Sequence, residues 1–388
     1  MLILLPAMVA SLLALCGMGY YVLCLWGARS FRRDSRKPLP QFTPPVSILK
    51  PLRGVDPAMY ESFRSHCLQD YPEYEIIFGV AEADDPAVEA VDRLAKEFPA
   101  CKIRLVQCPQ ILGTNRKASN LVQMLPHARY GHILINDSDI FVPPDYLRRI
   151  MSNFVRPEVG MVTALYRGIA TETLGSKLEA IGISTDFFAG VLAARQVENG
   201  IHFALGSTLA ISAGALEKIG GIAPLVDYLA DDYEMGKRTS KAGMEVVLSD
   251  LVVETHLPPY HFRDFFDHQM RWARSTRDSR RAGYLGLLFT FGLPWAIIAV
   301  PLALGAWWSW LVLGAATLLR AALALAVGRG LLHDENVVRD LWLLPLRDLV
   351  ALGVWFWSWA GHEVRWRGET FVLEDGKIRL KRARPAAN

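Results

Sequence analysis

Two long stretches of this 388-residue chain carry no charged side chain, and they constrain its fold more than any other feature. The first runs from Leu2 to Trp26. Because a helix needs about 20 apolar residues to cross the hydrocarbon core of a bilayer, this stretch predicts one membrane span. The second, from Gly283 to Leu319, is long enough for a tight helical pair, which we expect to break near Gly305.

A cleaved signal peptide is the alternative interpretation of the N-terminal stretch. A signal peptide carries its positive charge before a shorter apolar run. Here the basic residues follow the run, and they are Arg29, Arg32, Arg33, Arg36 and Lys37. Since Lys and Arg favour the cytoplasmic side, we expect an uncleaved anchor over residues 1–28 with its N-terminus outside. A basic, proline-rich linker then covers residues 29–45.

A further apolar block, residues 341–360, holds Arg347 and Asp348 near its middle. An ionised pair is expensive in lipid, so the block is predicted to face protein or to be re-entrant. Residues 361–388 form a basic tail that we expect to stay cytoplasmic. The basic residues of this tail are Arg365, Arg367, Lys377, Arg379, Lys381, Arg382 and Arg384. The expected topology is three crossings, the last two forming a hairpin over residues 283–327, plus one re-entrant or in-plane segment.

Residues 46–260 have the composition of a soluble domain and alternate β-rich with helical runs. This alternation predicts an α/β domain with a mostly parallel sheet. The expected strands are Val46 to Lys50, Glu75 to Val80, Ile103 to Gln107, Ile133 to Asn136 and Gly160 to Leu165. The expected helices are Pro86 to Glu97, Arg116 to Met124 and Asp145 to Asn153. The near balance of 42 basic and 39 acidic residues argues against a nucleic-acid partner.

The sequence Asp137-Ser138-Asp139 follows an apolar strand and is the most informative site signal. Two carboxylates one residue apart can converge on one ligand beyond the strand end, where ligands of such sheets bind. Paired carboxylates suit Mg²⁺ or Mn²⁺ bound together with substrate phosphates. The alternative is a pair of turn-forming or helix-capping aspartates before Pro143 and Pro144.

A second acidic cluster contains Asp231 and Asp232 and precedes an expected helix. Either aspartate can serve as an N-cap. A carboxylate beside a bound metal diphosphate can instead accept the proton of an attacking hydroxyl, as a general base.

Three acidic residues follow the expected strand that ends at Val80: Glu82, Asp84 and Asp85. They can hydrogen-bond the base or ribose of a nucleotide at the sheet edge. Alternatively, they are solvated loop residues before Pro86.

Two cations, Arg116 and Lys117, open an expected helix, where the helix dipole disfavours positive charge. A phosphate nearby would account for them, and a solvated basic turn is the alternative. Gly206-Ser207-Thr208 offers small residues where a sugar or acceptor can approach the backbone, although a strand bend explains them equally well.

Residues 261–281 are predicted to form an amphipathic interfacial helix. Its aromatic residues Phe262, Phe265 and Phe266 would face lipid. Its arginines, which would face headgroups or phosphates, are Arg263, Arg271, Arg274 and Arg277. His268, Arg271 and Trp272 share one helix face. The arginine can bind a diphosphate, and the tryptophan can pack against a sugar or lipid acceptor.

These motifs occur in a particular order between an N-terminal anchor and C-terminal membrane helices. In that respect the chain resembles the membrane-bound GT-A glycosyltransferases of family 2 type, and more closely the ceramide glucosyltransferase family. Three stretches look most like its hopanoid-biosynthesis branch, which transfers N-acetylglucosamine to bacteriohopanetetrol. These stretches are Pro44 to Leu52, Asn115 to Leu121 and Leu229 to Glu234.

The resemblance implies a cytosolic, Rossmann-like GT-A domain that binds a UDP-sugar, with Asp232 as the catalytic base. Asp137 and Asp139 would hold Mg²⁺ or Mn²⁺. Arg271 and Trp272 would end a QxxRW signature whose first position is His268 here, with a glutamine one residue later. The implied donor-binding residues are Glu82, Asp84, Lys117, Asp137, Asp231, His268, Gln269, Arg271 and Trp272.

The implied reaction is inverting transfer of one sugar, N-acetylglucosamine in preference, to the hydroxyl of a membrane lipid. The implied location is the inner membrane of a bacterium, with the catalytic domain cytoplasmic. A ceramide glucosyltransferase that uses UDP-glucose is the alternative enzyme. An inactive, membrane-anchored nucleotide-sugar-binding scaffold is the alternative outside enzymes.

Overall fold

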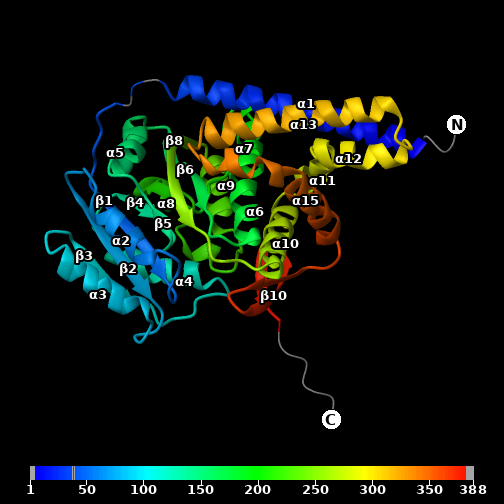
Figure 1. Ribbon diagram of the computed structural model, residues 1–388. Coiled ribbons are helices and arrows are strands. Elements are labelled where there is room, and N and C mark those ends of the chain that lie inside the picture. Colours follow the sequence, from blue (N-terminus) through cyan, green and yellow to red (C-terminus); the bar gives the residue numbers. More distant parts are fainter. Residues whose placement is uncertain (1–4, 37, 39, 382–388) are drawn as a thin grey trace, which may run out of the picture.

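The computed structural model describes residues 5–36, 38 and 40–381 of the chain. An α/β domain forms one part of the molecule, and three apolar helices extend together from it (Figure 1). Lys37, Arg382 and Arg384, which the sequence assigns to the basic linker and tail, lie outside the described residues.

An eight-stranded sheet with the order β3-β2-β1-β4-β7-β6-β8-β5 is the centre of the α/β domain. The first four strands in this order run parallel to one another, as do β6 and β8, whereas β7 and β5 run antiparallel to their neighbours. The predicted α/β fold with a mostly parallel sheet is confirmed. The strands are β1 (Val46–Leu52), β2 (Tyr74–Val80), β3 (Ile103–Gln107), β4 (His132–Ile135), β5 (Ile140–Phe141), β6 (Val159–Ile169), β7 (Leu209–Ser212) and β8 (Glu245–His256).

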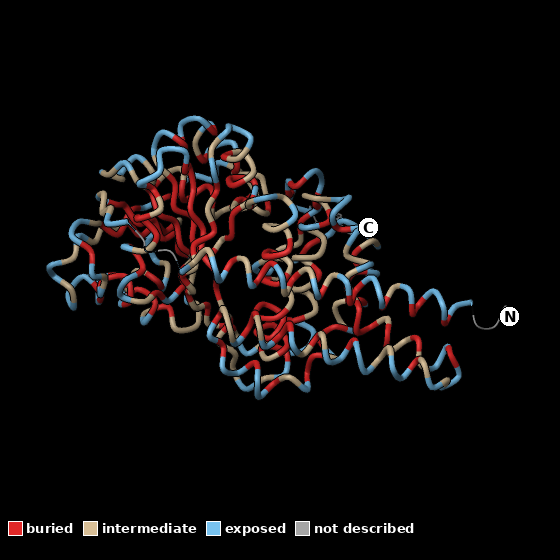
Figure 2. The backbone as a smooth tube through the Cα atoms, turned by 90° about the horizontal axis from the view of Figure 1, so that it is seen from above, coloured by how far each residue is buried: buried red, intermediate tan, exposed pale blue. Residues whose placement is uncertain are grey.

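Helices flank this sheet, and the core lies between the sheet and these helices. In Figure 2 the buried residues gather in the strands. β1 is buried along its whole length, as expected for a central strand covered on both faces. The helices of the domain are α2 (Met59–Cys67), α3 (Ala87–Glu97), α4 (Arg116–Met124), α5 (Tyr146–Met151), α6 (Leu174–Gly182), α7 (Phe188–Val197), α8 (Ala213–Lys218) and α9 (Asp231–Lys241).

The predicted N-terminal span is the long helix α1 (Leu5–Asp34), which packs against the C-terminal helices. A Cβ on Gly17 of α1 would lie 2.3 Å from the Cα of Gly292, so small residues let these helices approach closely. The C-terminal helices are α10 (Phe262–Ser279), α11 (Arg281–Gly286), α12 (Gly292–Leu302), α13 (Trp307–Ala324), α14 (Asn336–Asp340) and α15 (Leu344–Ser358). Leu304 and Gly305, both with positive φ, separate α12 from α13, which confirms the predicted break.

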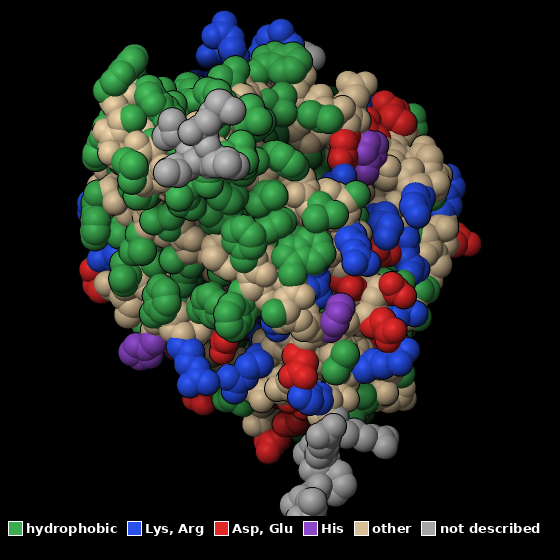
Figure 3. Space-filling model, turned by 90° about the vertical axis from the view of Figure 1, so that its right-hand side faces the viewer, with side chains coloured by type: hydrophobic (Ala, Val, Ile, Leu, Met, Phe, Trp, Pro, Cys, Tyr) green, Lys and Arg blue, Asp and Glu red, His purple; other side chains and the backbone are tan. Residues whose placement is uncertain are grey.

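Within the described residues, Leu5–Asp34 and Trp307–Arg329 are long and apolar enough to cross a membrane. A pair of helices bent by 47°, Arg281–Phe289 with Gly292–Leu302, would make a third span. Figure 3 shows hydrophobic side chains gathered over much of the face toward which these helices project. The chain is therefore a membrane protein, and the number of three crossings stays a prediction.

The two charges inside the apolar block 341–360 both face protein. Asp348 on α15 is buried and accepts two hydrogen bonds from the Arg320 guanidinium of α13, at 2.7 and 2.9 Å. Arg347 is also buried and donates to Oε1 of Gln269 at 3.3 Å. The protein thus supplies the partners that lipid would not.

The predicted interfacial helix exists as α10, but its aromatic side chains do not all face outward. Phe265 is fully buried with Leu178, Ile181 and Leu344, because α10 packs between α6 and α15. The lipid-facing assignment is wrong for Phe265, whereas Phe262 is exposed.

Two arginines of α10 also differ from the sequence expectation. Arg274 donates to the carbonyl of Ala360 at 2.8 Å, and Arg277 donates to that of Gly361 at 3.1 Å. Both guanidinium groups therefore bind the chain that follows α15, so their assignment to lipid headgroups or phosphates is wrong.

The basic tail contains a second, antiparallel sheet of β9 (Glu363–Trp366), β10 (Glu369–Glu374) and β11 (Lys377–Leu380). Its apolar residues Val364, Phe371, Leu373 and Ile378 are buried together with Leu229. Basic residues alternate with these apolar ones, so the charge of the segment masks a strand pattern in the sequence.

Candidate active site

The turn after β4 carries Asp137-Ser138-Asp139, and buried polar side chains fix it from both sides. Asn136 donates to the carbonyl of Ser207 at 2.6 Å. Lys50, in the fully buried strand β1, donates from Nζ to the carbonyl of Asp137 at 2.9 Å. Burial lowers the pKa of Lys50 to about 7, against the opposing effect of Asp139 and Asp137.

The two carboxylates of this turn have different partners. Oδ2 of Asp139 accepts a hydrogen bond from Thr255 of β8 at 2.6 Å. Burial, and next the charge of Asp137, raise the pKa of Asp139 to about 6. Asp137 itself contacts a cation, since its Oδ1 lies 2.6 Å from Nζ of Lys117.

Lys117 lies at the start of α4, next to both acidic clusters. Asn115 caps this helix by accepting from the Ala118 amide at 3.1 Å, and it donates to Oδ1 of Asp231 at 3.3 Å. Nζ of Lys117 lies 3.8 Å from Oδ2 of Asp231. Burial lowers the pKa of Lys117, but Asp137 and Asp231 outweigh it and raise the pKa above the ordinary value. The alternative of a solvated basic turn does not hold for Lys117.

Asp232 lies in the first turn of α9 and faces the same space as Asp137. A Cβ on Gly206 would lie 3.0 Å from Oδ2 of Asp232 and 3.8 Å from Oδ2 of Asp137. Gly206 therefore leaves room in which the two acidic clusters meet. Burial, and next the charge of Asp231, raise the pKa of Asp232 to about 6, so this carboxylate can exchange a proton near neutral pH.

Four predicted site residues lie on α10: His268, Gln269, Arg271 and Trp272. His268 and Gln269 face the buried Glu179: His268 Nδ1 lies 3.2 Å from Oε1 without hydrogen-bonding geometry, and Gln269 donates to Oε2 at 2.7 Å. Trp272 packs on Phe187, with ring centroids 5.5 Å apart.

Arg271 differs from its neighbours, because its guanidinium makes no hydrogen bond or ion pair with any residue that the structure describes. Burial lowers its pKa, and the charge of Arg367 lowers it further, while Asp137 is among the groups that oppose this shift. Arg271 is thus a half-buried cation near the carboxylate cluster, with no anion of the described chain bound to it.

The acidic loop after β2 is not part of the carboxylate cluster. The side chains of Glu82 and Asp84 are exposed and make no hydrogen bond or ion pair within the described ranges. Asp85 accepts from the Gly54 amide at 2.9 Å and from the Ala87 amide at 2.9 Å. It therefore caps α3 and ties down the loop after β1, beside which the two exposed carboxylates lie.

Sequence reasoning missed several residues that hold the site together: Lys50, Asn115, Thr255 and Asp56. Asp56, in the loop after β1, accepts a hydrogen bond from Ser138. A lysine inside an otherwise apolar strand was a usable signal for Lys50, because a buried ammonium needs a partner.

Asp137 and Asp139 offer two carboxylates to a metal ion. Among the described residues, no group of three or more His, Cys, Asp and Glu side chains is placed to hold one. Two carboxylates completed by substrate phosphates are a common Mg²⁺ arrangement. Asp137 and Asp139 stand one residue apart on the turn after β4, and Oδ2 of Asp137 faces the space beside Gly206. The residues fit the predicted ion.

Comparison with known proteins gives the family. Residues 9–379 match the model of glycosyl transferase family 21. The chain is 28% identical to ceramide glucosyltransferase 3 of Caenorhabditis elegans over 232 residues. This match covers 60% of this chain and 50% of that protein. Ceramide glucosyltransferase 1 of the same organism is 27% identical over 232 residues, 60% and 49% of the two chains. The chain spans about half the length of the curated relatives it matches.

Among solved structures, the chain is similar to the mannosyltransferase PcManGT of Pyrobaculum calidifontis, which was solved in complex with GDP-Man and Mn²⁺. The TM-score is 0.58 at 20% identity, and the match covers 91% of this chain and 97% of that one. This likeness shows the fold. The chain therefore belongs to glycosyl transferase family 21, with a ceramide glucosyltransferase-like GT-A fold.

Proposed function

We propose that this chain transfers a single sugar from a UDP-sugar to a hydroxyl group of a membrane lipid, with inversion at the anomeric carbon. One observation carries the proposal: Asp137 and Asp232, 95 positions apart in the sequence, face the same space beside Gly206. One acidic cluster suits a metal-bound diphosphate and the other suits a base, so their meeting point is where a sugar between them would lie.

In the proposed reaction, Asp232 accepts the proton of the acceptor hydroxyl as its oxygen attacks the anomeric carbon. The bond from that carbon to the diphosphate breaks, and UDP leaves with the electron pair. Arg271, which has no anionic partner in the described chain, stabilises the charge that develops on UDP. A divalent cation held by Asp137 and Asp139 would neutralise the same charge when bound.

The other predicted donor-binding residues take secondary places in this proposal. Lys117 of α4 positions Asp137 through their ion pair. Asp231, which contacts Asn115 and Lys117, positions the adjacent Asp232. Glu82 and Asp84 are exposed after the end of β2, where they can hydrogen-bond the base or ribose of the nucleoside. Trp272 offers a ring surface to the sugar or acceptor, whereas His268 and Gln269 act through Glu179.

Membrane attachment supports a lipid acceptor, because such a substrate meets a water-soluble UDP-sugar only at the bilayer surface. We propose that the α/β domain lies in the cytoplasm, since basic residues follow the first span. The resemblance to the hopanoid branch supports the inner membrane of a bacterium as its location.

N-acetylglucosamine and bacteriohopanetetrol are the proposed donor sugar and acceptor, supported by the resemblance of three sequence stretches to the hopanoid branch. The relatives named ceramide glucosyltransferase favour a second candidate, UDP-glucose with ceramide. Incubating detergent-purified protein with each donor and each acceptor, followed by mass spectrometry of the lipids, tests the choice. We expect a product mass only for UDP-GlcNAc with bacteriohopanetetrol, and glucosylceramide would establish the second candidate.

An inactive nucleotide-sugar-binding scaffold is tested by the same incubation with total bacterial lipid. Release of UDP at a rate that depends on added lipid is the expected result. Binding of UDP-sugar without any release would establish the scaffold instead.

A further inference from the structure

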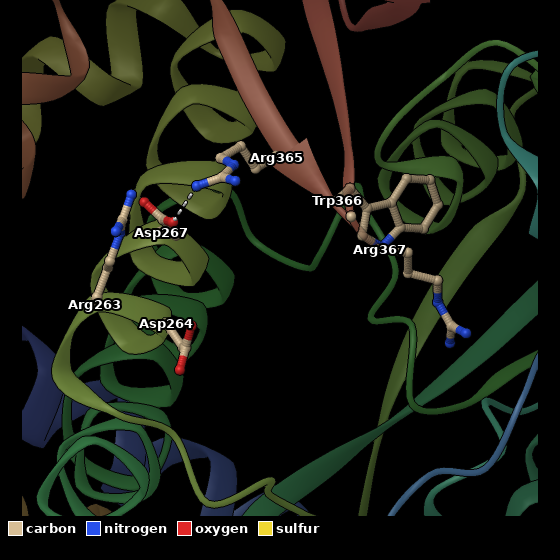
Figure 4. Close-up of a pocket in the computed structure, with 7 residues that line it drawn as sticks. Arg263, Asp264, Asp267, Arg365, Trp366 and Arg367 are labelled. Atoms are coloured by element: carbon tan, nitrogen blue, oxygen red, sulfur yellow. Dashed lines mark hydrogen bonds and ion pairs between the residues drawn. The ribbon is translucent and has the colours of Figure 1, made fainter.

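A cleft of about 420 Å³ opens between the first half of α10 and the hairpin that joins β9 to β10 (Figure 4). The residues that line it are Arg263, Asp264, Asp267, Arg365, Trp366, Arg367 and Gly368. On α10, Asp264, Asp267 and Arg271 are spaced three and four residues apart and so share one helix face. The cleft therefore lies on the side of α10 that carries Arg271, which has no hydrogen-bond or ion-pair partner among residues 5–36, 38 and 40–381.

The small sheet that forms one wall is tied to the active site. The Ile378 amide donates to the carbonyl of Asp227 at 2.8 Å, and the Leu229 amide donates to that of Gly376 at 3.0 Å. The Gly376 amide also donates to the Asp278 carboxylate of α10. The C-terminal sheet thus joins α10 to the segment that leads into Asp231.

Arg367, at the tip of the hairpin, reaches the loop after β1. Its guanidinium donates to the carbonyl of Arg53 at 2.7 Å and lies 3.7 Å from Oδ2 of Asp56. Asp56 in turn accepts from Ser138, between the two metal-site aspartates. Figure 4 shows Arg365 turned toward Asp267 on α10, whereas Arg367 extends away from those residues.

The charge of Arg367 also acts on Arg271, whose pKa it lowers in addition to the larger effect of burial. Arg367 reaches the carboxylate turn through Asp56, and Arg271 lies on the side of α10 that borders the cleft. An anion between them would relieve their repulsion, and a diphosphate matches the planar fork of each guanidinium.

The backbone at this tip is unusual for an arginine. Arg367 and Gly368 have φ values of 48° and 84°, as in a two-residue turn that favours Asn, Asp or Gly at its first position. The next turn of the same sheet has the preferred pair, Asp375 and Gly376, at 49° and 77°. Because a Cβ disfavours this conformation, an arginine here is better explained by its charge than by folding.

We propose that Arg367 is a donor-binding residue whose guanidinium contacts the phosphates of the nucleoside diphosphate sugar, so that the β9–β10 hairpin closes the donor site. This inference rests on the proposed function. The side chain is 41% exposed, which leaves it free to exchange Asp56 for a phosphate.

The test uses the full chain in detergent with Mn²⁺ and measures Kd for UDP and for uridine by calorimetry. Arg367→Asn removes the cation but suits the turn, so the thermal midpoint is expected to hold or rise. The Kd for UDP is expected to rise about tenfold or more, as for loss of a charged hydrogen bond, while that for uridine stays unchanged. Arg367→Lys should give an intermediate Kd for UDP.

Arg379→Ala is the matched control, because it removes the same charge from an 80% exposed side chain of the same sheet, outside the cleft. It should leave both constants unchanged. Equal loss of UDP and uridine affinity in Arg367→Asn, or an unchanged Kd for UDP, overturns the inference alone. A wild-type chain that does not bind UDP overturns the proposed function and this inference together.

Discussion

Replacing Asp232 by Asn separates the proposed base from every other feature of the site. The substitution keeps the shape of the side chain, and the Asn oxygen can still accept from the Tyr233 amide, now 2.8 Å from Oδ1. The group that faces Gly206 becomes an amide that cannot take a proton. Removing a general base lowers a rate by about 10²–10⁴-fold, which corresponds to about 3–5 kcal/mol.

The upper part of this range is expected, because the two nearest carboxylates of the described residues already have partners. Oδ1 of Asp137 lies 2.6 Å from the Lys117 ammonium. Asp231 is the adjacent carboxylate, but its Oδ1 accepts from Asn115 and its Oδ2 lies 3.8 Å from the Lys117 ammonium. Folding should not suffer, since burial already disfavours the ionised form of Asp232. A thermal melt of the variant is therefore expected to match or exceed that of the wild type.

The assay measures lipid product per time under saturating UDP-sugar, together with Kd for UDP. Glu234→Gln is the matched control, because it removes a carboxylate from the same helix turn, where Glu234 pairs with Lys237 at 2.6 Å. We expect the control to transfer sugar nearly as fast as the wild type and both variants to keep their affinity for UDP. The assignment of the base would be refuted if the Asp232→Asn variant kept more than a tenth of the wild-type rate. Loss of UDP binding together with transfer would refute it as well.

Four further outcomes are expected. The transfer rate should fall tenfold per pH unit below about pH 6, because Asp232 has its pKa raised to about 6 and accepts a proton only when ionised; a rate independent of pH from 5 to 7 contradicts this. EDTA should stop transfer and Mg²⁺ or Mn²⁺ should restore it, and full activity in EDTA counts against the metal. Gly206→Ala should lower the transfer rate with little change in stability, because its Cβ would lie 3.0 Å from the Asp232 carboxylate, whereas Gly214→Ala meets no atom within 4 Å and should stay active. Phe265→Ala should lower the free energy of unfolding by about 3–5 kcal/mol, while Phe262→Ala on the exposed side should not; equal melts for the two variants would show that Phe265 is not buried.

The parallel half of the sheet was predictable because most of its strands are short, nearly continuous apolar runs that are buried on both faces. β1, β2, β4 and β6 carry this signal. β3 lies at the edge of the sheet and is only partly buried, and its short β-rich run alone indicated it. The strands that sequence reasoning missed differ in a physical way. β5 has only two residues, Ile140–Phe141, and β7 only four, Leu209–Ser212, so neither is long enough to show a period. β8 alternates buried and partly exposed positions over 12 residues, but Ser249 and Asp250 interrupt its apolar residues.

Helix α10 shows where spacing along one element is not sufficient. Its sequence correctly indicates a helix, and His268 and Arg271 do lie three residues apart on it. Which side of a helix is buried depends on its neighbours, however, and Glu179 on α6 and Arg347 on α15 contact Gln269 from elements 90 and 78 residues away. No local pattern contains that information.

The site contains two kinds of residue. Some belong to a sequence motif, and others only position the motif residues. Asp137, Asp139 and Asp232 were found because each acidic pair stands at the end of an expected strand or the start of an expected helix, and because the order of these motifs resembles that of a known family. Lys50 and Asn115 lack any such motif, yet they hold the backbone of Asp137 and the side chain of Asp231.

Both positioning residues nevertheless break an otherwise regular pattern, since Lys50 interrupts a buried strand and Asn115 comes directly before a helix. A buried ammonium is tolerated only where an oxygen receives it, so a lysine in a central strand already implies an acidic or carbonyl partner at the strand end. Following that implication from Lys50 leads to the turn that carries Asp137 without any reference to a family motif.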